Sequence, residues 1–283
     1  MMFGLSELLK MLFGYRIGHN NMKTDKSNGI KKDIAAMHRQ LGRPLICVPI
    51  VDVDYDGVLS SCEAVKKEPA DIVEWRIDFF EKCHDIEQVK YMLAEIKKCI
   101  GELPLICTFR THHEGGGEIE ISEYLELVKD IAAAGLIDYV DVEIKRFNKN
   151  EAKKIFENIR RDGTRVIASC HYFEYTPEDN EMSGIFEEMA EAGADVLKLA
   201  VMPSNRHDVI RLLGFTEKAS GKYEQPIITM SMGKLGLVSR IAGELTGSVL
   251  TFATAGNASA PGQIPAKDMA AIFDIFDSDR DDF

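Results

Sequence analysis

The sequence lacks several features that would each point to a particular class of protein. No stretch of about 18 or more uncharged apolar residues occurs, so neither a transmembrane helix nor a membrane partner is expected. Positive charge is also scarce, because 34 Lys and Arg stand against 46 Asp and Glu and leave a net charge of −12. An acidic chain repels a phosphate backbone, which argues against nucleic acid as a partner.

Paired cysteines and metal-ligand spacings are missing as well. The six cysteines, at positions 47, 62, 83, 99, 107 and 170, include no C-x-x-C pair, and three of them lie in apolar runs. We therefore expect buried, reduced thiols in a cytoplasmic protein rather than a disulfide framework or a zinc site. The seven histidines form no ligand-spaced set, and the adjacent His112 and His113 should face different ways on a turn. Neither a metal nor an organic cofactor is predicted.

The two ends of the chain differ from its body in charge. Residues 1–43 hold eight Lys and Arg against three Asp and Glu, whereas the remainder holds 26 against 43. We interpret residues 1–43 as an N-terminal extension, for which three arrangements stay open: a loosely ordered segment, a helix packed on the body, or a membrane-surface anchor. Residues 1–15 show no small-residue cleavage site, which argues against a secretory signal. Residues 277–283 form an acidic tail that should fray.

Residues 44–276 alternate between short apolar runs and longer charged segments of helical period. The apolar runs predict eight strands, at Leu45–Val51, Ile72–Ile77, Leu105–Phe109, Tyr139–Ile144, Arg165–Ser169, Val196–Val201, Ile227–Met230 and Ser248–Phe252. Helical patterns follow at Ile86–Cys99, Ser122–Ala134, Glu151–Arg161, Glu181–Ala192, Asp208–Ala219, Leu237–Leu245 and Lys267–Phe276. Such alternation predicts parallel strands that close into a single (β/α)8 TIM barrel, an α/β fold. An open doubly wound sheet is the alternative, although no G-x-G-x-x-G follows the first strand.

Lys198 is the most informative single residue, because it interrupts the apolar run of residues 194–201. A strand that is apolar on both faces belongs to a parallel sheet covered by helices, where an ammonium is expensive to desolvate. Burial lowers the pKa of a lysine and so makes its amine available as a nucleophile towards ketones. The alternative is a lysine that extends its amine to solvent at the end of the strand.

Polar residues gather where the predicted strands end, which is the catalytic face of a TIM barrel. Glu74 and Arg76 point to the same side of the second strand, where a structural ion pair between them is the alternative to a role in binding. His171 ends the fifth strand, where a satisfied core histidine is the alternative. Glu143 ends the fourth strand, where we expect it to support the charged network rather than to react.

These segments together resemble the type I 3-dehydroquinate dehydratases, the Schiff-base enzymes of the shikimate pathway. The resemblance runs from about Leu45 to Met269 in unbroken order. Its motifs are E-W-R-x-D at 74–78, F-R-T-x-x-E-G-G at 109–116, S-C-H at 169–171, L-K at 197–198, M-G-x-x-G-x-x-S-R at 232–240 and S-A-P-G-Q at 259–263. The resemblance implies a lyase that converts 3-dehydroquinate, its small-molecule substrate, to 3-dehydroshikimate. It also implies a TIM barrel and commonly a homodimer.

The resemblance assigns a role to each matching residue. Lys198 matches the lysine that forms an imine with the substrate, and His171 matches the general acid/base. Glu114 matches the residue that holds this histidine and fixes its tautomer. The substrate-binding matches are Arg240 for the carboxylate, Glu74, Arg76 and Arg110 for the ring hydroxyls, and Ser259 and Gln263 on a loop that covers the ligand.

Two departures and two further hypotheses accompany this interpretation. Residues 51–55 read V-D-V-D-Y where the family tends to have small, hydroxyl or basic residues, and residues 1–43 lack the pattern of the small hairpin that closes the barrel bottom in relatives. Another lysine-imine lyase, such as a class I aldolase, would bind a sugar phosphate, but no phosphate loop is present. A non-catalytic relative could bind a carboxylated metabolite or a partner protein, although an intact Lys198, His171 and Glu114 set argues against it.

Overall fold

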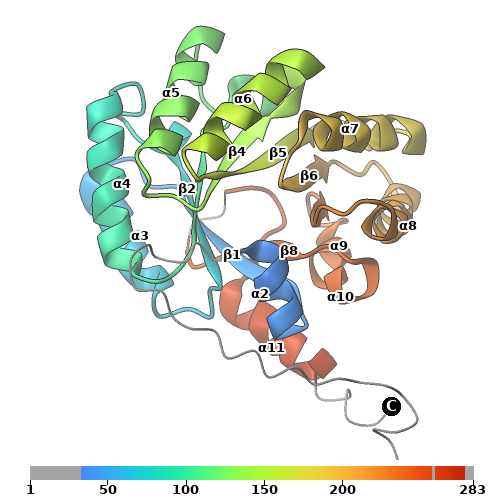
Figure 1. Ribbon diagram of the computed structural model, residues 1–283. Coiled ribbons are helices and arrows are strands. Elements are labelled where there is room, and N and C mark those ends of the chain that lie inside the picture. The colour runs from blue at the N-terminus through green and yellow to red at the C-terminus, as the bar shows by residue number, and fades with distance from the viewer. Residues whose placement is uncertain (1–32, 257–258, 278–283) are drawn as a thin grey trace, which may run out of the picture. The chain divides into compact units, whose positions relative to one another are not determined.

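The computed structural model describes residues 33–256 and 259–277, and these contain a parallel β-barrel surrounded by helices (Figure 1). Most of the predicted N-terminal extension, residues 1–32, and residues 278–283 of the predicted tail lie outside the described residues. Within the described ranges, no helix has both the length and the apolar character that a membrane span requires.

The eight predicted strands are all present. They are β1 (Leu45–Ile50), β2 (Ile72–Arg76), β3 (Leu105–Thr108), β4 (Tyr139–Glu143), β5 (Arg165–Tyr172), β6 (Val196–Val201), β7 (Ile227–Ser231) and β8 (Leu250–Thr254). From β1 to β7 each strand pairs in parallel with the next, and β8 pairs back to β1. An isolated bridge between Ile227 and Ser248 joins β7 to the segment before β8. The sheet therefore closes on itself, as expected for a TIM barrel, and a short β9 (Ile264–Pro265) adds to β8.

Helices cover the outside of the barrel between successive strands (Figure 1). They are α3 (Tyr55–Val65), α4 (Ile86–Ile100), α5 (Ile121–Ala133), α6 (Lys149–Arg161), α7 (Asp179–Ala192), α8 (Arg206–Lys222), α9 (Leu237–Ile241), α10 (Gly243–Thr246) and α11 (Ala266–Asp277). Short 3-10 turns follow three strands, at Ile77–Phe79, His112–Glu114 and Ile144–Arg146.

Strand residues alternate between two hydrophobic layers, and this alternation decides which side chains enter the barrel. On β6, Leu197 and Leu199 pack outwards against the helices, whereas Val196 and Ala200 belong to the inner cluster. Lys198 lies between the latter two, so the two-residue period directs its side chain into the barrel. The same period directs the acidic and basic residues of the other strands inwards, above an apolar lower layer.

The structure differs from the predicted elements in three places that affect the site or its frame. No helix was predicted over residues 55–65, where Gly57 weakens the helical pattern, yet Asp54 caps α3 by accepting from the Gly57 amide. The single helix predicted over 237–245 is two helices, because Ala242 leaves helical geometry at φ −86° and ψ 10°. Strand β5 continues to Tyr172, so His171 lies on the strand and pairs in register with Ala200.

Part of the predicted N-terminal extension is a helix, α2 (Ile34–Leu41), whose first residues pack at the barrel bottom. Ile34 is fully buried in the inner cluster, and its amide donates to the hydroxyl of Tyr139 at 2.9 Å. Asp33 caps the helix through the Ala36 amide and lies 3.5 Å from Arg165. Of the three arrangements left open above, residues 34–41 therefore show the packed helix.

Candidate active site

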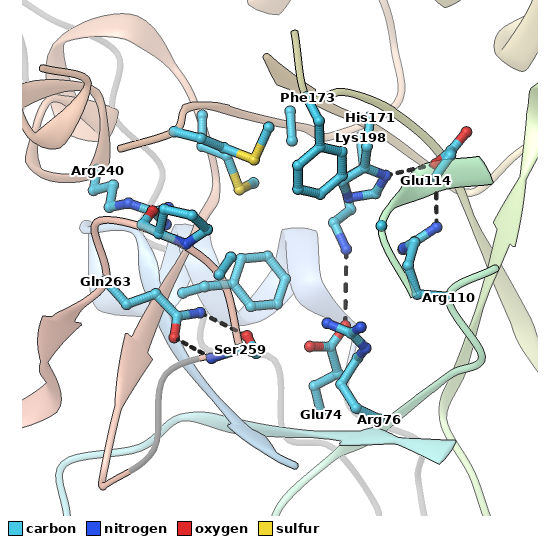
Figure 2. Close-up of a pocket in the computed structure, with 17 residues that line it drawn as sticks. Glu74, Arg76, Arg110, Glu114, His171, Phe173, Lys198, Arg240, Ser259 and Gln263 are labelled. Carbon is cyan, nitrogen blue, oxygen red and sulfur yellow. Dashed lines mark hydrogen bonds and ion pairs between the residues drawn. The ribbon is translucent and has the colours of Figure 1, made fainter. Parts of the chain in front are cut away.

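A pocket of about 180 Å³ lies at the carboxyl ends of the barrel strands (Figure 2). Its walls combine side chains from β2, β5, β6 and β7 with residues of the loops that follow β3 and β8. All the site residues predicted from the sequence line it, namely Glu74, Arg76, Arg110, Glu114, His171, Lys198, Arg240, Ser259 and Gln263. The fold therefore brings together residues that are up to about 190 positions apart in the sequence.

Lys198 is buried and lies between two carboxylates. Its Nζ donates to Oδ2 of Asp141 at 2.8 Å and lies 3.8 Å from Oε1 of Glu74. The ring of Phe252 lies on another side, with its centroid 4.6 Å from Nζ. Burial of Lys198 was expected from the sequence, and the structure adds two carboxylates that compensate the charge of its ammonium.

His171 and Glu114 form a hydrogen-bonded pair at the edge of the same pocket. Nδ1 of His171 lies 2.7 Å from Oε2 of Glu114. Burial lowers the pKa of the His171 imidazole well below its ordinary value, and the positive charges of Arg110 and Lys198 lower it further. Burial likewise raises the pKa of the Glu114 carboxyl well above its ordinary value, although Arg110 opposes the effect. The imidazole is therefore held neutral, with one ring nitrogen committed to the carboxyl group.

Arg110 connects this pair to the strands around it. Its guanidinium donates to Asp141 at 2.8 Å, to Glu143 at 3.1 Å, to Ser169 at 3.0 Å and to Glu114 at 3.3 Å. These contacts occupy the guanidinium with protein groups, so Arg110 orders the network as well as lining the pocket.

Asp141 was not among the predicted site residues, although it makes the closest contact to Lys198. Its Oδ1 accepts from Arg110 and from the hydroxyl of Ser169 at 2.5 Å. Burial alone would raise the pKa of Asp141, but the charges of Arg110 and Lys198 outweigh burial and hold the pKa well below its usual range. Asp141 lies two residues before Glu143 on β4, so the two-residue strand period could have indicated that its side chain also points into the barrel.

Three further charged residues, Arg76, Glu74 and Glu143, bond to other groups of the protein. Arg76 pairs with Asp78 through two hydrogen bonds of 2.9 and 2.8 Å rather than with Glu74, so the predicted alternative of a Glu74–Arg76 ion pair is wrong. Glu74 instead accepts from the Thr108 hydroxyl at 2.8 Å. Glu143 accepts from the amide and hydroxyl of Thr111, each at 2.7 Å, as expected for a supporting residue.

Arg240 presents the opposite case of a buried cation without an acidic partner. It is 2% exposed, and no ion pair to it occurs in the part of the chain that the structure describes. Its Nη2 donates to the carbonyl of Pro261 at 3.0 Å, while Nε and Nη1 have no hydrogen-bond partner there. Burial lowers the pKa of Arg240 to about 10. Two donors of a planar guanidinium are thus available to an anion in the pocket.

Ser259 and Gln263 lie on the loop between β8 and β9 and bond to each other. The amide nitrogen of the Gln263 side chain donates to Oγ of Ser259 at 2.8 Å, and the Ser259 backbone amide donates to Oε1 of Gln263 at 2.9 Å. Residues 257–258 of this loop lie outside the described residues.

Sequence analysis also missed the apolar part of the pocket wall. Phe173, Met230, Met232 and Phe252 line it beside the polar groups, and the ring of Phe173 stacks at 6.4 Å from that of His171. The two-residue period of β7 and β8 could have indicated that Met230, Met232 and Phe252 point into the barrel. Phe173 follows the end of β5, so strand period could not place it.

The expectation that His112 and His113 face different ways is wrong. Both lie on the 3-10 turn after β3, and their exposed rings approach to 3.8 Å between centroids, while His112 pairs with Glu118 at 2.8 Å. Across residues 33–256 and 259–277, no group of three His, Cys, Asp or Glu side chains is arranged to hold a metal ion.

The sequence and structure of this chain are similar to those of known 3-dehydroquinate dehydratases. The family model for type I 3-dehydroquinase matches residues 46–280. A 3-dehydroquinate dehydratase of Listeria innocua is 41% identical over 237 residues, which cover 83% of this chain and 93% of that relative. The crystal structure of a type I 3-dehydroquinate dehydratase from Clostridium difficile, with covalently modified comenic acid, aligns with a TM-score of 0.80 and 39% identity over 84% of this chain and 94% of that one. A 3-dehydroquinate dehydratase from Geobacillus kaustophilus aligns with a TM-score of 0.81 and 35% identity over 83% and 92%.

Proposed function

This chain belongs to the type I 3-dehydroquinase family, the Schiff-base class of 3-dehydroquinate dehydratases in the shikimate pathway, and on that premise we propose which of its residues perform the reaction. The observation that carries the proposal is that Lys198 and His171 project from neighbouring strands into one pocket that also contains Arg240 (Figure 2). A nucleophile, a base and an anion-binding group are thus present around a volume that a small ring can occupy.

We assign imine formation to Lys198. Its Nζ attacks the ketone carbon of 3-dehydroquinate, and loss of water from the resulting carbinolamine gives an iminium ion. The amine must first lose the proton that it shares with Asp141 at 2.8 Å. The iminium ion restores a positive charge at this nitrogen, so Asp141 and Glu74 again lie opposite a cation until the enamine forms.

Proton transfer falls to His171, with Glu114 as its positioning residue. A carboxylate at Glu114 accepts the Nδ1 proton, which leaves the lone pair of Nε2 to remove a proton next to the iminium carbon. The electron pair of that C–H bond moves into the iminium to give an enamine. His171 then returns the proton to the departing hydroxyl, which leaves as water, and hydrolysis of the conjugated imine releases 3-dehydroshikimate and the free lysine.

We assign binding of the substrate carboxylate to Arg240. A substrate carboxylate can accept from the unpartnered donors of this arginine, and this anion would supply the counter-charge that the described residues do not. Glu74, Arg76 and Arg110 line the side of the pocket near Lys198, where we assign them to the ring hydroxyls, and Ser259 and Gln263 cover the ligand.

Borohydride trapping tests the proposal. Incubation with 3-dehydroquinate and borohydride should add the mass of a reduced imine to the intact protein, and peptide mapping should place the adduct on Lys198. The Lys198→Arg variant keeps a cation beside Asp141 but cannot form an imine, so it should carry no adduct and lose about 10⁴-fold or more in kcat. An adduct of equal yield in the folded variant would disprove the assignment of Lys198.

We also propose a cytoplasmic homodimer with residues 44–276 as its catalytic barrel. All six cysteines are free thiols in the structure, which supports a reducing compartment. The dimer is supported by the family resemblance alone, and light scattering of the purified protein would contradict it by giving a monomer mass of about 31.6 kDa.

A further inference from the structure

The two sequence motifs around Arg240, residues 232–240 and 259–263, contact each other through their backbone. Arg240 belongs to the 232–240 motif, and Pro261 and Gly262 belong to the 259–263 motif. The carbonyl of Pro261 accepts from Nη2 of Arg240 at 3.0 Å and from the Gly233 amide at 3.2 Å. One backbone oxygen therefore contacts both the guanidinium and the loop that precedes it in the chain.

Gly262 permits this approach for a steric reason. Its φ is +78°, a region that side chains with a Cβ rarely adopt. A Cβ at this position would lie 2.5 Å from the carbonyl oxygen and 2.8 Å from the carbonyl carbon of Gly233. These obstacles are backbone atoms, so an added methyl group must displace one loop from the other.

We infer that Pro261 and Gly262 are positioning residues for Arg240, which hold its guanidinium in place to bind the substrate carboxylate. This inference rests on the proposed role of Arg240. The Pro261 carbonyl is the hydrogen-bond partner of Arg240 in the part of the chain described, and a flexible arginine side chain without it has no other polar group there to orient its fork. The contact between Gly233 and Gly262 sets where that carbonyl lies.

The Gly262→Ala variant tests the inference, with Gly256→Ala as its matched control. A Cβ at Gly256 meets no atom of the described residues within 4 Å, and its φ is not in the positive region, so the control adds the same methyl group to the same loop without a clash among them. We expect Gly262→Ala to raise KM for 3-dehydroquinate about tenfold or more, because charge-assisted hydrogen bonds to the carboxylate are misaligned. Its kcat should change by less than about twofold, since the carboxylate is not a reacting group.

Two further readouts separate positioning from general damage to the loop. The double variant Arg240→Ala/Gly262→Ala should have the KM of Arg240→Ala alone, because Gly262 acts only through the guanidinium. Borohydride trapping of cyclohexanone, a ketone without a carboxylate, should proceed on Lys198 at the same rate in wild type and in Gly262→Ala. Unchanged KM in Gly262→Ala, additive effects in the double variant, or slower trapping of cyclohexanone would each overturn the inference.

Failure of the proposed function is distinguishable from failure of this inference. If wild type forms no adduct with 3-dehydroquinate, the assignment of Lys198 fails before Gly262 is tested. If wild type and Gly262→Ala both form the adduct at saturating substrate while their KM values agree, only the positioning role is wrong. A cooperative thermal unfolding transition in each of the Gly262→Ala and Gly256→Ala variants, above the assay temperature, shows that both are folded.

Discussion

Lys198 and Arg240 are both buried cations of one pocket, yet the protein treats their charges in opposite ways (Figure 2). Lys198 lies against Asp141 and Glu74, and Arg240 has a backbone carbonyl as its partner and no described acidic residue. In the proposed function the lysine reacts, and carboxylates of the protein compensate its charge in the free enzyme. The arginine is proposed to bind the substrate, whose carboxylate would compensate its charge. The difference shows how one pocket can separate covalent chemistry from recognition.

The largest effect that would sharpen this comparison is on stability. Asp141→Asn removes the anion shared by Lys198 and Arg110, so the free energy of unfolding should fall by about 3–5 kcal/mol. Arg240→Met removes a buried cation without leaving an acid unpaired, so its free energy of unfolding should equal or exceed that of wild type. Urea unfolding at pH 7 measures both. A loss in Arg240→Met as large as that in Asp141→Asn would show that Arg240 is compensated after all.

A smaller effect concerns recognition. Arg240→Lys keeps the charge but replaces a planar fork by a point charge, so KM should rise about tenfold to hundredfold while kcat stays close to wild type. Steady-state kinetics measure the two constants, with Arg206→Lys, an exposed substitution at the start of α8, as the control. If Arg240→Lys lowers kcat and leaves KM unchanged, Arg240 acts in the chemical step and the separation of roles is wrong.

The smallest effect near neutral pH is on the pH dependence of the kinetic constants. His171 should determine the acidic limb of the profile and Arg240 the alkaline limb. His171 acts as a base only when neutral, and its pKa is lowered, so kcat/KM should fall with decreasing pH only below about 6.5, its ordinary value. Arg240 binds an anion only when charged, so KM should rise as the pH passes through about 10. The alkaline rise should be absent in Arg240→Met. Its persistence there would assign it to another group.

Local patterns were sufficient for the barrel and for the neighbourhood of the site. The apolar run of residues 194–201 identified Lys198 as a buried lysine, and the parallel strands placed the other predicted residues at the same end of the barrel. Partner identity could not be predicted in the same way, because Asp141 lies 57 positions from Lys198 and its distance depends on the register of three strands. The alternative of a Glu74–Arg76 ion pair was wrong because the turn after β2 brings Asp78 to Arg76 instead.

Segments with weak or mixed patterns were the other source of error. Helix α3 depends on a cap at Asp54 and on three buried positions, Val58, Cys62 and Val65, in a stretch that also contains glycine and serine. Helix α2 depends on Ile34, whose burial against the barrel bottom is a tertiary contact with no local signal. The close approach of the His112 and His113 rings, which are tilted by 39° to each other, arises from side-chain conformations that sequence does not specify.

The contacts of Arg110 and Asp141 have a consequence for protein engineering. Together they join β3, β4, β5 and β6 at the end of the barrel where the chemistry is proposed to occur. A designer who transfers only a lysine and a histidine to another barrel would therefore copy the reacting atoms and omit the bonds that keep four strand ends in register. The minimal transferable unit is the lysine and histidine with this arginine, aspartate and serine, on a scaffold whose strands have the same stagger.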